Sequence, residues 1–251
     1  MDWPSLGIGV LASIIAAAIV YFIAWSKGYV SGSWILFLCL VKLQKRLKSA
    51  GLTNFFSSRS DFGRYRGAPR LIDYLSLAKE SVDVAAYWMA HGNEAEGIAD
   101  GIAKLVQPPQ KIKVTIAIID PTAIYIDELA SYLNIEAKEL KLRIESSLNN
   151  LYKAREKLSI EEKNRFRIKV YKTIPIASVI MIDGETNYGR IQLDFRPYKV
   201  PRHYSFAFEF SGRGNYLYDL CRNAWKKLID DASDYEPSKK VMESVQDSKS
   251  I

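Results

Sequence analysis

The chain has 251 residues, of which 48% are hydrophobic and 25% are charged, so it is long enough for one domain plus an additional segment. Its 35 basic and 28 acidic residues give a formal net charge of +7, which predicts an anionic partner. With two cysteines and two histidines, it is too poor in both for a disulfide-rich scaffold or the usual zinc-hydrolase sites.

The N-terminal region, residues 1–41, is predicted to be membrane-associated. Leu6–Trp25 is a run of 20 uncharged residues, the length of a helix that spans a bilayer. A cleaved signal peptide is a weaker interpretation, because no basic region precedes the run. The following Tyr29–Val41 is about 13 residues long and fits either a second span or an interfacial helix.

The next segment, residues 42–70, is predicted to be a basic juxtamembrane region. It carries eight basic residues and one acidic residue, whereas residues 71–251 carry 26 of each. Basic residues beside a membrane segment stay in the cytoplasm, so we expect a membrane protein with most of its chain cytoplasmic. Lys42–Lys48 fit a topology signal as well as they fit an anion site. Arg59, which lies in a turn-like SSRSD, and Arg64 and Arg66, which follow it, are predicted to bind anionic lipid.

Residues 71–232 alternate helix and strand signals and predict a cytoplasmic α/β domain, a mixed sheet flanked by helices. Residues 233–251 are polar and predicted to form a flexible tail. The expected helices are 70–81, 93–107, 131–158 and 214–232, and the expected strands are 81–90, 111–120, 165–175, 178–184, 189–195 and 203–212.

A second basic cluster lies in the C-terminal half of this domain, among aromatic residues. Such a pattern binds phosphate groups, although a solvated loop between strands at Pro197 and Pro201 explains it about as well. Asp183 before Gly184 fits a hairpin turn, and His91 fits a loop at a strand end. We therefore predict no catalytic residue, no metal ligand and no cofactor. The anion-binding candidates of this cluster are Arg190, Arg196, Lys199 and Arg202, and Lys172, on an earlier strand, is a further candidate that could reach the same pocket.

Two stretches, VDVAAYW to VTIAIID and FRIKVYKTIPIASVIMIDGETNYGRI, resemble a single phospholipase-D-like half-domain. The active family carries H-x-K-x4-D in the second stretch. Aligning its aspartate on Asp183 puts Ser178 in place of the lysine and Ile176 in place of the histidine nucleophile. The resemblance therefore implies the fold without the catalysis, so we expect a protein that is not an enzyme.

The segments GLTNFFSSRSDFGRYRG, TIPIASVIMIDGETNYGRIQ and RPYKVPRHYSFAFEF resemble degenerate phospholipase-D-like domains of predicted antiviral effectors. With the N-terminal anchor, the chain is similar to the membrane effector of short prokaryotic Argonaute systems. That resemblance implies guide-directed activation, binding of anionic phospholipid, membrane depolarisation and abortive infection. The implied partners are anionic phospholipid, the Argonaute or its associated protein, and further copies of the chain when active, without direct sequence-specific nucleic-acid binding.

Two alternatives stay open at this point. One is a membrane-bound phospholipase or nuclease with a non-standard site, against which the missing histidine and lysine argue. The other is a membrane adaptor that recruits a nucleic-acid-guided complex.

Overall fold

A computed structural model describes residues 41–57, 71–89, 92–174, 177–201 and 204–237. The chain divides into two units, Met1–Ser49 and Ala50–Ile251. In the first unit, residues 41–49 form a helix whose basic and apolar side chains are all exposed. No helix among the described residues is long and apolar enough to cross a membrane, and the predicted span Leu6–Trp25 lies outside them.

The second unit is built on an eight-stranded mixed sheet with the order β1-β7-β6-β5-β2-β3-β4-β8. Strands β2, β3 and β4 are parallel, and every other pairing is antiparallel. The predicted mixed α/β sheet flanked by helices is therefore confirmed. The strands are β1 (Leu52–Phe56), β2 (Ser81–Ala86), β3 (Lys113–Ile119), β4 (Phe166–Tyr171), β5 (Ser178–Ile182), β6 (Arg190–Phe195), β7 (Phe206–Ser211) and β8 (Ser233–Asp234).

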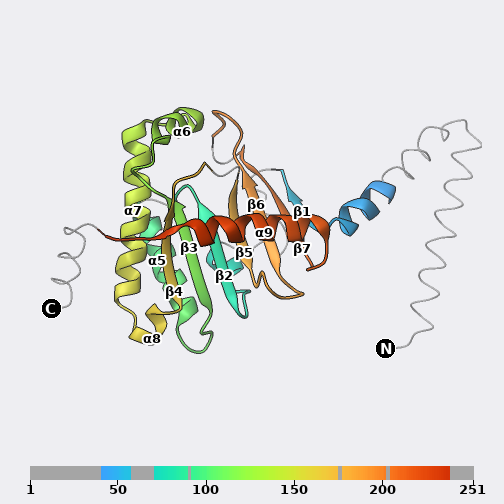
Figure 1. The fold of residues 1–251 in the computed structure, drawn as a ribbon, viewed down its shortest axis with the longest axis horizontal. Coiled ribbons are helices and arrows are strands. Elements are labelled where there is room, and N and C mark those ends of the chain that lie inside the picture. The colour runs from blue at the N-terminus through green and yellow to red at the C-terminus, as the bar shows by residue number, and fades with distance from the viewer. Residues whose placement is uncertain (1–40, 58–70, 90–91, 175–176, 202–203, 238–251) are drawn as a thin grey trace, which may run out of the picture. The chain divides into compact units, whose positions relative to one another are not determined.

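Helices cover both faces of this sheet, with α9 across one face and α5 and α7 on the other (Figure 1). Isoleucine, valine and alanine fill β2 and β3, as expected for parallel strands that are covered on both sides. The described helices of this unit are α4 (Leu71–Leu75), α5 (Gly92–Val106), α6 (Ile126–Leu133), α7 (Ala137–Glu156), α8 (Ile160–Lys163) and α9 (Tyr216–Asp231).

The apolar core has two parts. The larger part lies among β2, β3, β4 and helices α5, α6 and α7, and includes the fully buried Ile116, Ile102 and Ile144. The smaller part joins β5, β6 and β7 to α9, where Tyr218 is fully buried and Trp225 packs against both parts. Helix α9 thereby joins the antiparallel half of the sheet to the parallel half.

The structure differs from the expected elements at several points. The predicted helix 131–158 is interrupted, because Asn134 adopts a left-handed conformation with φ 57° and ends α6. The sheet also extends beyond the expected domain, since β1 lies within 42–70 and β8 within 233–251.

Candidate functional site at the carboxyl edge of the sheet

The two ends of the strands define two edges of the sheet. We call the end at which β2, β3, β4 and β6 finish, and at which β5 and β7 begin, the carboxyl edge. The opposite end is the amino edge. Ligands of open α/β sheets bind outside the carboxyl ends of the parallel strands, so the carboxyl edge is the natural place to look for a site.

Three of the predicted anion-binding residues lie at the carboxyl edge and one does not. Lys172 follows β4, whereas Arg196 and Lys199 follow β6. Arg190 begins β6 opposite Ile182, at the amino edge, so the structure separates it from the other three. The other predicted anion-binding residues, Arg59, Arg64, Arg66 and Arg202, and also His91, lie outside the described residues.

Arg196 is held in place by backbone carbonyls as well as by an aromatic ring. Its Nη2 donates to the Leu133 carbonyl at 2.9 Å, and its Nε donates to the Val200 carbonyl at 3.2 Å. Its guanidinium also lies 5.8 Å from the centre of the Trp88 ring, within the range of a cation–π contact. Arg196 therefore fixes the β6–β7 connection against the end of α6, in addition to any role in binding.

Arg143, on α7, is a further cation at this edge, and it was not predicted from the sequence. Its guanidinium lies 5.5 Å from the Trp88 ring centre, and it forms an ion pair with Glu139 one turn earlier. Its Nε is buried and has no hydrogen-bond partner among the described residues. No local signal marked it, because an arginine in a helix rich in charged residues looks like an ordinary surface residue.

Lys199 lies in the β6–β7 connection, whose backbone is held against the end of α6. Its own backbone N–H donates to the Tyr132 carbonyl at 2.9 Å, and the Tyr132 and Tyr198 rings make a tilted contact with ring centres 5.5 Å apart. The Lys199 ammonium lies 5.1 Å from the Tyr198 ring and forms no ion pair with a described residue. Lys172 is 73% exposed and has only a long contact of 3.7 Å with Asp120. Both lysines can therefore contact an anion from solvent.

The phenols at the carboxyl edge are proton donors rather than bases. Burial raises the pKa of Tyr125 to about 12, with the neighbouring Asp120 charge adding to the effect. Burial likewise raises the pKa of Tyr87 to about 12, and it raises the pKa of Tyr171, whose hydroxyl donates to the Ala86 carbonyl at 2.9 Å. At neutral pH these phenols stay protonated, and the single hydroxyl proton of Tyr171 is already donated to the Ala86 carbonyl.

The positions that match the phospholipase-D-like motif fall at opposite ends of β5. Ser178 begins the strand at the carboxyl edge, and Asp183 follows it at the amino edge. The buried Asp183 carboxylate accepts from the backbone N–H groups of Lys79, Glu80 and Ser81 at 2.7–3.1 Å. Asp183 thus joins the β5–β6 turn to the start of β2, which is a structural role. Ile176 lies outside the described residues.

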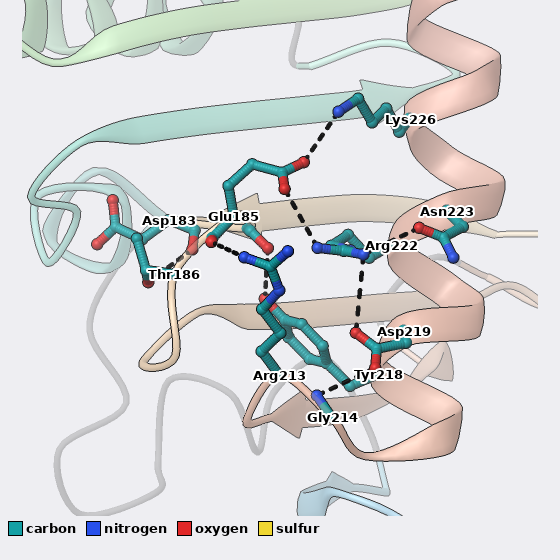
Figure 2. Close-up of polar contacts among 11 residues, drawn as sticks. Asp183, Glu185, Thr186, Arg213, Gly214, Tyr218, Asp219, Arg222, Asn223 and Lys226 are labelled. Atoms are coloured by element: carbon teal, nitrogen blue, oxygen red, sulfur yellow. Dashed lines mark hydrogen bonds and ion pairs between the residues drawn. The ribbon is translucent and has the colours of Figure 1, made fainter.

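The β5–β6 turn is also joined to α9 by four residues, Glu185, Arg213, Arg222 and Lys226, which we call the Glu185 cluster (Figure 2). The Glu185 carboxylate lies 3.2 Å from Arg222 Nη1 and 3.1 Å from Lys226 Nζ, and Arg213 Nη1 donates to its carbonyl at 2.7 Å. The hydrogen bond from Lys226 lowers the pKa of Glu185. These cations are therefore engaged in holding the fold at the amino edge.

Carboxylates elsewhere in the described residues do not form a metal site. No group of three His, Cys, Asp or Glu side chains in this part of the chain lies close enough to hold a metal ion. Asp83, in the middle of β2, has its pKa raised to about 6, first by burial, while a hydrogen bond from Thr115 opposes the shift.

Comparisons with known proteins give only distant structural likenesses. No family model and no curated protein matches this sequence. Among solved structures, the chain is similar to the phospholipase D family member Nuc from Salmonella typhimurium, with 12% identity, a TM-score of 0.38 and coverage of 66% of this chain and 88% of that one.

Two further solved structures are similar at the same level. TrmBL2, an archaeal chromatin protein, has 10% identity, a TM-score of 0.41 and coverage of 89% of this chain and 70% of that one. The polyphosphate kinase from Porphyromonas gingivalis has 15% identity, a TM-score of 0.34 and coverage of 68% and 24%. Scores this low do not fix a shared function, so the site has to be interpreted from its own residues.

Proposed function

We propose that this chain is a membrane-anchored effector whose carboxyl edge binds anionic phospholipid without hydrolysing it. The observation that supports the proposal best is that Lys172, Arg196 and Lys199 all lie at one edge of the sheet, where β5, β2 and β3 separate β6 from β4. In the resembled half-domain this edge would carry the histidine and lysine of the motif, which Ile176 and Ser178 replace here. A cationic edge that lacks the family's histidine nucleophile can hold a phosphate group without attacking it by the family's route.

The proposal includes activation by a nucleic-acid-guided short Argonaute or its associated protein. It rests there on the sequence resemblance and on the predicted span Leu6–Trp25. Activation would lead to assembly of several copies, membrane depolarisation and death of the infected cell. Co-expression with an adjacent short Argonaute and its guide tests this part, since toxicity should require both the effector and a matching target.

Lipid selectivity tests the binding step. The full chain in mild detergent with equal amounts of phosphatidylglycerol and phosphatidylcholine should retain phosphatidylglycerol preferentially in native mass spectrometry. Replacing Lys172 and Lys199 with glutamate should reduce that preference. The matched control replaces Arg190 and Lys113, two exposed basic residues at the amino edge, with glutamate and should leave the preference unchanged. Equal retention by both double variants would contradict lipid binding at the carboxyl edge.

Product analysis tests the absence of hydrolysis. The full chain should release no glycerol or glycerol phosphate from phosphatidylglycerol, and should cut neither DNA nor RNA. Turnover that persists through purification and disappears with Ser178→Ala would instead favour a phospholipase or nuclease with a non-standard site.

A further inference from the structure

Apolar side chains project from the connections at the carboxyl edge. Ile124, between β3 and α6, is 96% exposed, and Ile174, after β4, is 54% exposed. Tyr198 and Tyr204, between β6 and β7, are 58% and 61% exposed. One exposed apolar residue is ordinary, but this set occupies three connections of one edge.

Contacts link these connections to one another and to α6. The Asp120 backbone N–H donates to the Tyr171 carbonyl at 2.9 Å and joins the end of β3 to the end of β4. A tilted contact between the Tyr132 and Tyr198 rings joins the end of α6 to the β6–β7 connection. The exposed side chains are therefore presented at one edge of the sheet.

Charge distinguishes the β6–β7 connection from the α8 turn of the amino edge. The connection 196–205 contains Arg196, Lys199 and Arg202 and no acidic residue. The amino edge also has an exposed isoleucine, Ile160, which is 80% exposed on α8, but Glu161 and Glu162 follow it directly before Lys163. An anionic surface would attract the connection 196–205 more strongly than α8. Ile124 lies between Asp120 and the acidic first turn of α6, so the attraction comes from Lys172 and Lys199 and not from the neighbours of Ile124.

We propose that Ile124 and Ile174 insert into the boundary between head groups and acyl chains of an anionic bilayer. Tyr198 and Tyr204 then lie at the interface, where tyrosine is enriched, and Lys172 and Lys199 contact lipid phosphates. Binding at an interface depends on buried apolar area together with attraction to anionic lipid, and this edge has both. The inference rests on the proposed function for its lipid partner and adds an apolar contribution that head-group binding does not require.

Site-directed spin labelling of the full chain in vesicles tests the insertion. In a Cys39→Ser, Cys221→Ser background, nitroxides are placed by Ile124→Cys and, as the control, Ile160→Cys. In phosphatidylglycerol vesicles the label at 124 should be accessible to oxygen and shielded from a water-soluble nickel chelate, while the label at 160 should remain aqueous. In phosphatidylcholine vesicles both labels should be aqueous.

Substitution tests the same idea without labels. Ile124→Asp with Ile174→Asp should weaken the association of the carboxyl edge with phosphatidylglycerol vesicles by about tenfold or more, measured as loss of lipid exposure of a label at Tyr204→Cys. Ile160→Asp, the same substitution at an exposed isoleucine of the amino edge, should not change the lipid exposure of that label.

The outcomes separate this inference from the proposed function. If both labels stay aqueous while the chain still retains phosphatidylglycerol selectively, the insertion is wrong and head-group binding stands. If neither insertion nor selective retention is found, both are wrong. A label at 124 that is immobilised but shielded from oxygen and nickel alike would indicate a protein contact and overturn insertion. Equal insertion into phosphatidylcholine would overturn the contribution of the lysines.

Discussion

The two edges of the sheet use their charged residues differently. At the amino edge, Asp183 is buried under three backbone N–H groups and Glu185 is paired with cations of α9. At the carboxyl edge, Lys199 has no ion pair among the described residues, and Lys172 has one long contact. These two carboxylates of the amino edge are thus engaged in holding the fold, whereas two lysines of the carboxyl edge keep their capacity to bind a ligand.

The largest effect is expected from Asp183→Ala. It would leave the partly buried N–H groups of Lys79, Glu80 and Ser81 without their charged acceptor, at a cost of about 1–3 kcal/mol for each group. We expect a loss of at least about 3 kcal/mol in the free energy of unfolding, from urea unfolding of the full chain in detergent followed by circular dichroism. Asp183→Asn keeps one acceptor oxygen and should lose less. An unchanged stability in Asp183→Ala would show that the comparison of the two edges is wrong.

A glycine in the same turn should give the next largest effect. A Cβ on Gly189 would lie 2.1 Å from the Tyr218 hydroxyl and 2.6 Å from the Asp183 carbonyl. Gly189→Ala should therefore destabilise the chain by about 1–3 kcal/mol through overpacking. The control is Gly97→Ala in α5, where a Cβ would meet nothing within 4 Å, and it should stabilise by about 0.5–1 kcal/mol. Equal effects of the two substitutions would remove the case for a tightly packed amino edge.

At the carboxyl edge, substitutions of the neighbouring Arg196 and Lys199 should have different effects on stability, because Arg196 holds the fold and the Lys199 side chain does not. Arg196→Ala leaves the Leu133 and Val200 carbonyls without their donor and should cost about 1–2 kcal/mol. Lys199→Ala should change the free energy of unfolding by less than about 0.5 kcal/mol, because its ammonium makes no hydrogen bond to a described residue. A large loss in the free energy of unfolding with Lys199→Ala would mean that Lys199 also holds the fold and that the two edges do not differ in this respect.

Much of the fold could be predicted from the sequence, because periodicity reports burial directly. The predicted helix 131–158 contains α7, whose Leu140, Ile144, Leu148 and Leu151 recur at helical spacing and are buried, and the predicted strands 111–120 and 178–184 contain β3 and β5. Strand β1 was missed because LTNFF lies in a segment dominated by its basic charge, and its pairing with β7 joins residues more than 150 positions apart.

The site was harder to predict than the fold. Spacing along the chain grouped Arg190 with Arg196, but six residues of extended strand place them at opposite edges. Arg143 joins the site only through the packing of α7 beside Trp88, which no pattern in one segment encodes. A motif of one strand also could not show that Asp183 would satisfy three backbone N–H groups of a different loop.

The smallest effect is expected at the Glu185 cluster, because the Glu185 side chain is 56% exposed. An exposed pair contributes about 0–1 kcal/mol, so Glu185→Gln should lower the free energy of unfolding at pH 7 by less than about 1 kcal/mol. The pKa of Glu185 is lowered in the folded state, so its contribution exists above the unfolded pKa of about 4.3 and is lost as the pH falls through the folded value. The difference between the wild type and Glu185→Gln should therefore be full at pH 7 and shrink below about pH 4.5, and high salt should reduce it at pH 7.

Asp127→Asn is the control, since Asp127 is 75% exposed and lies 3.8 Å from Lys141, and it should show no such difference. A Glu185→Gln deficit that persists unchanged at pH 3 would mean that the carboxylate charge does not hold the turn, and that packing of Tyr218 under the turn is sufficient.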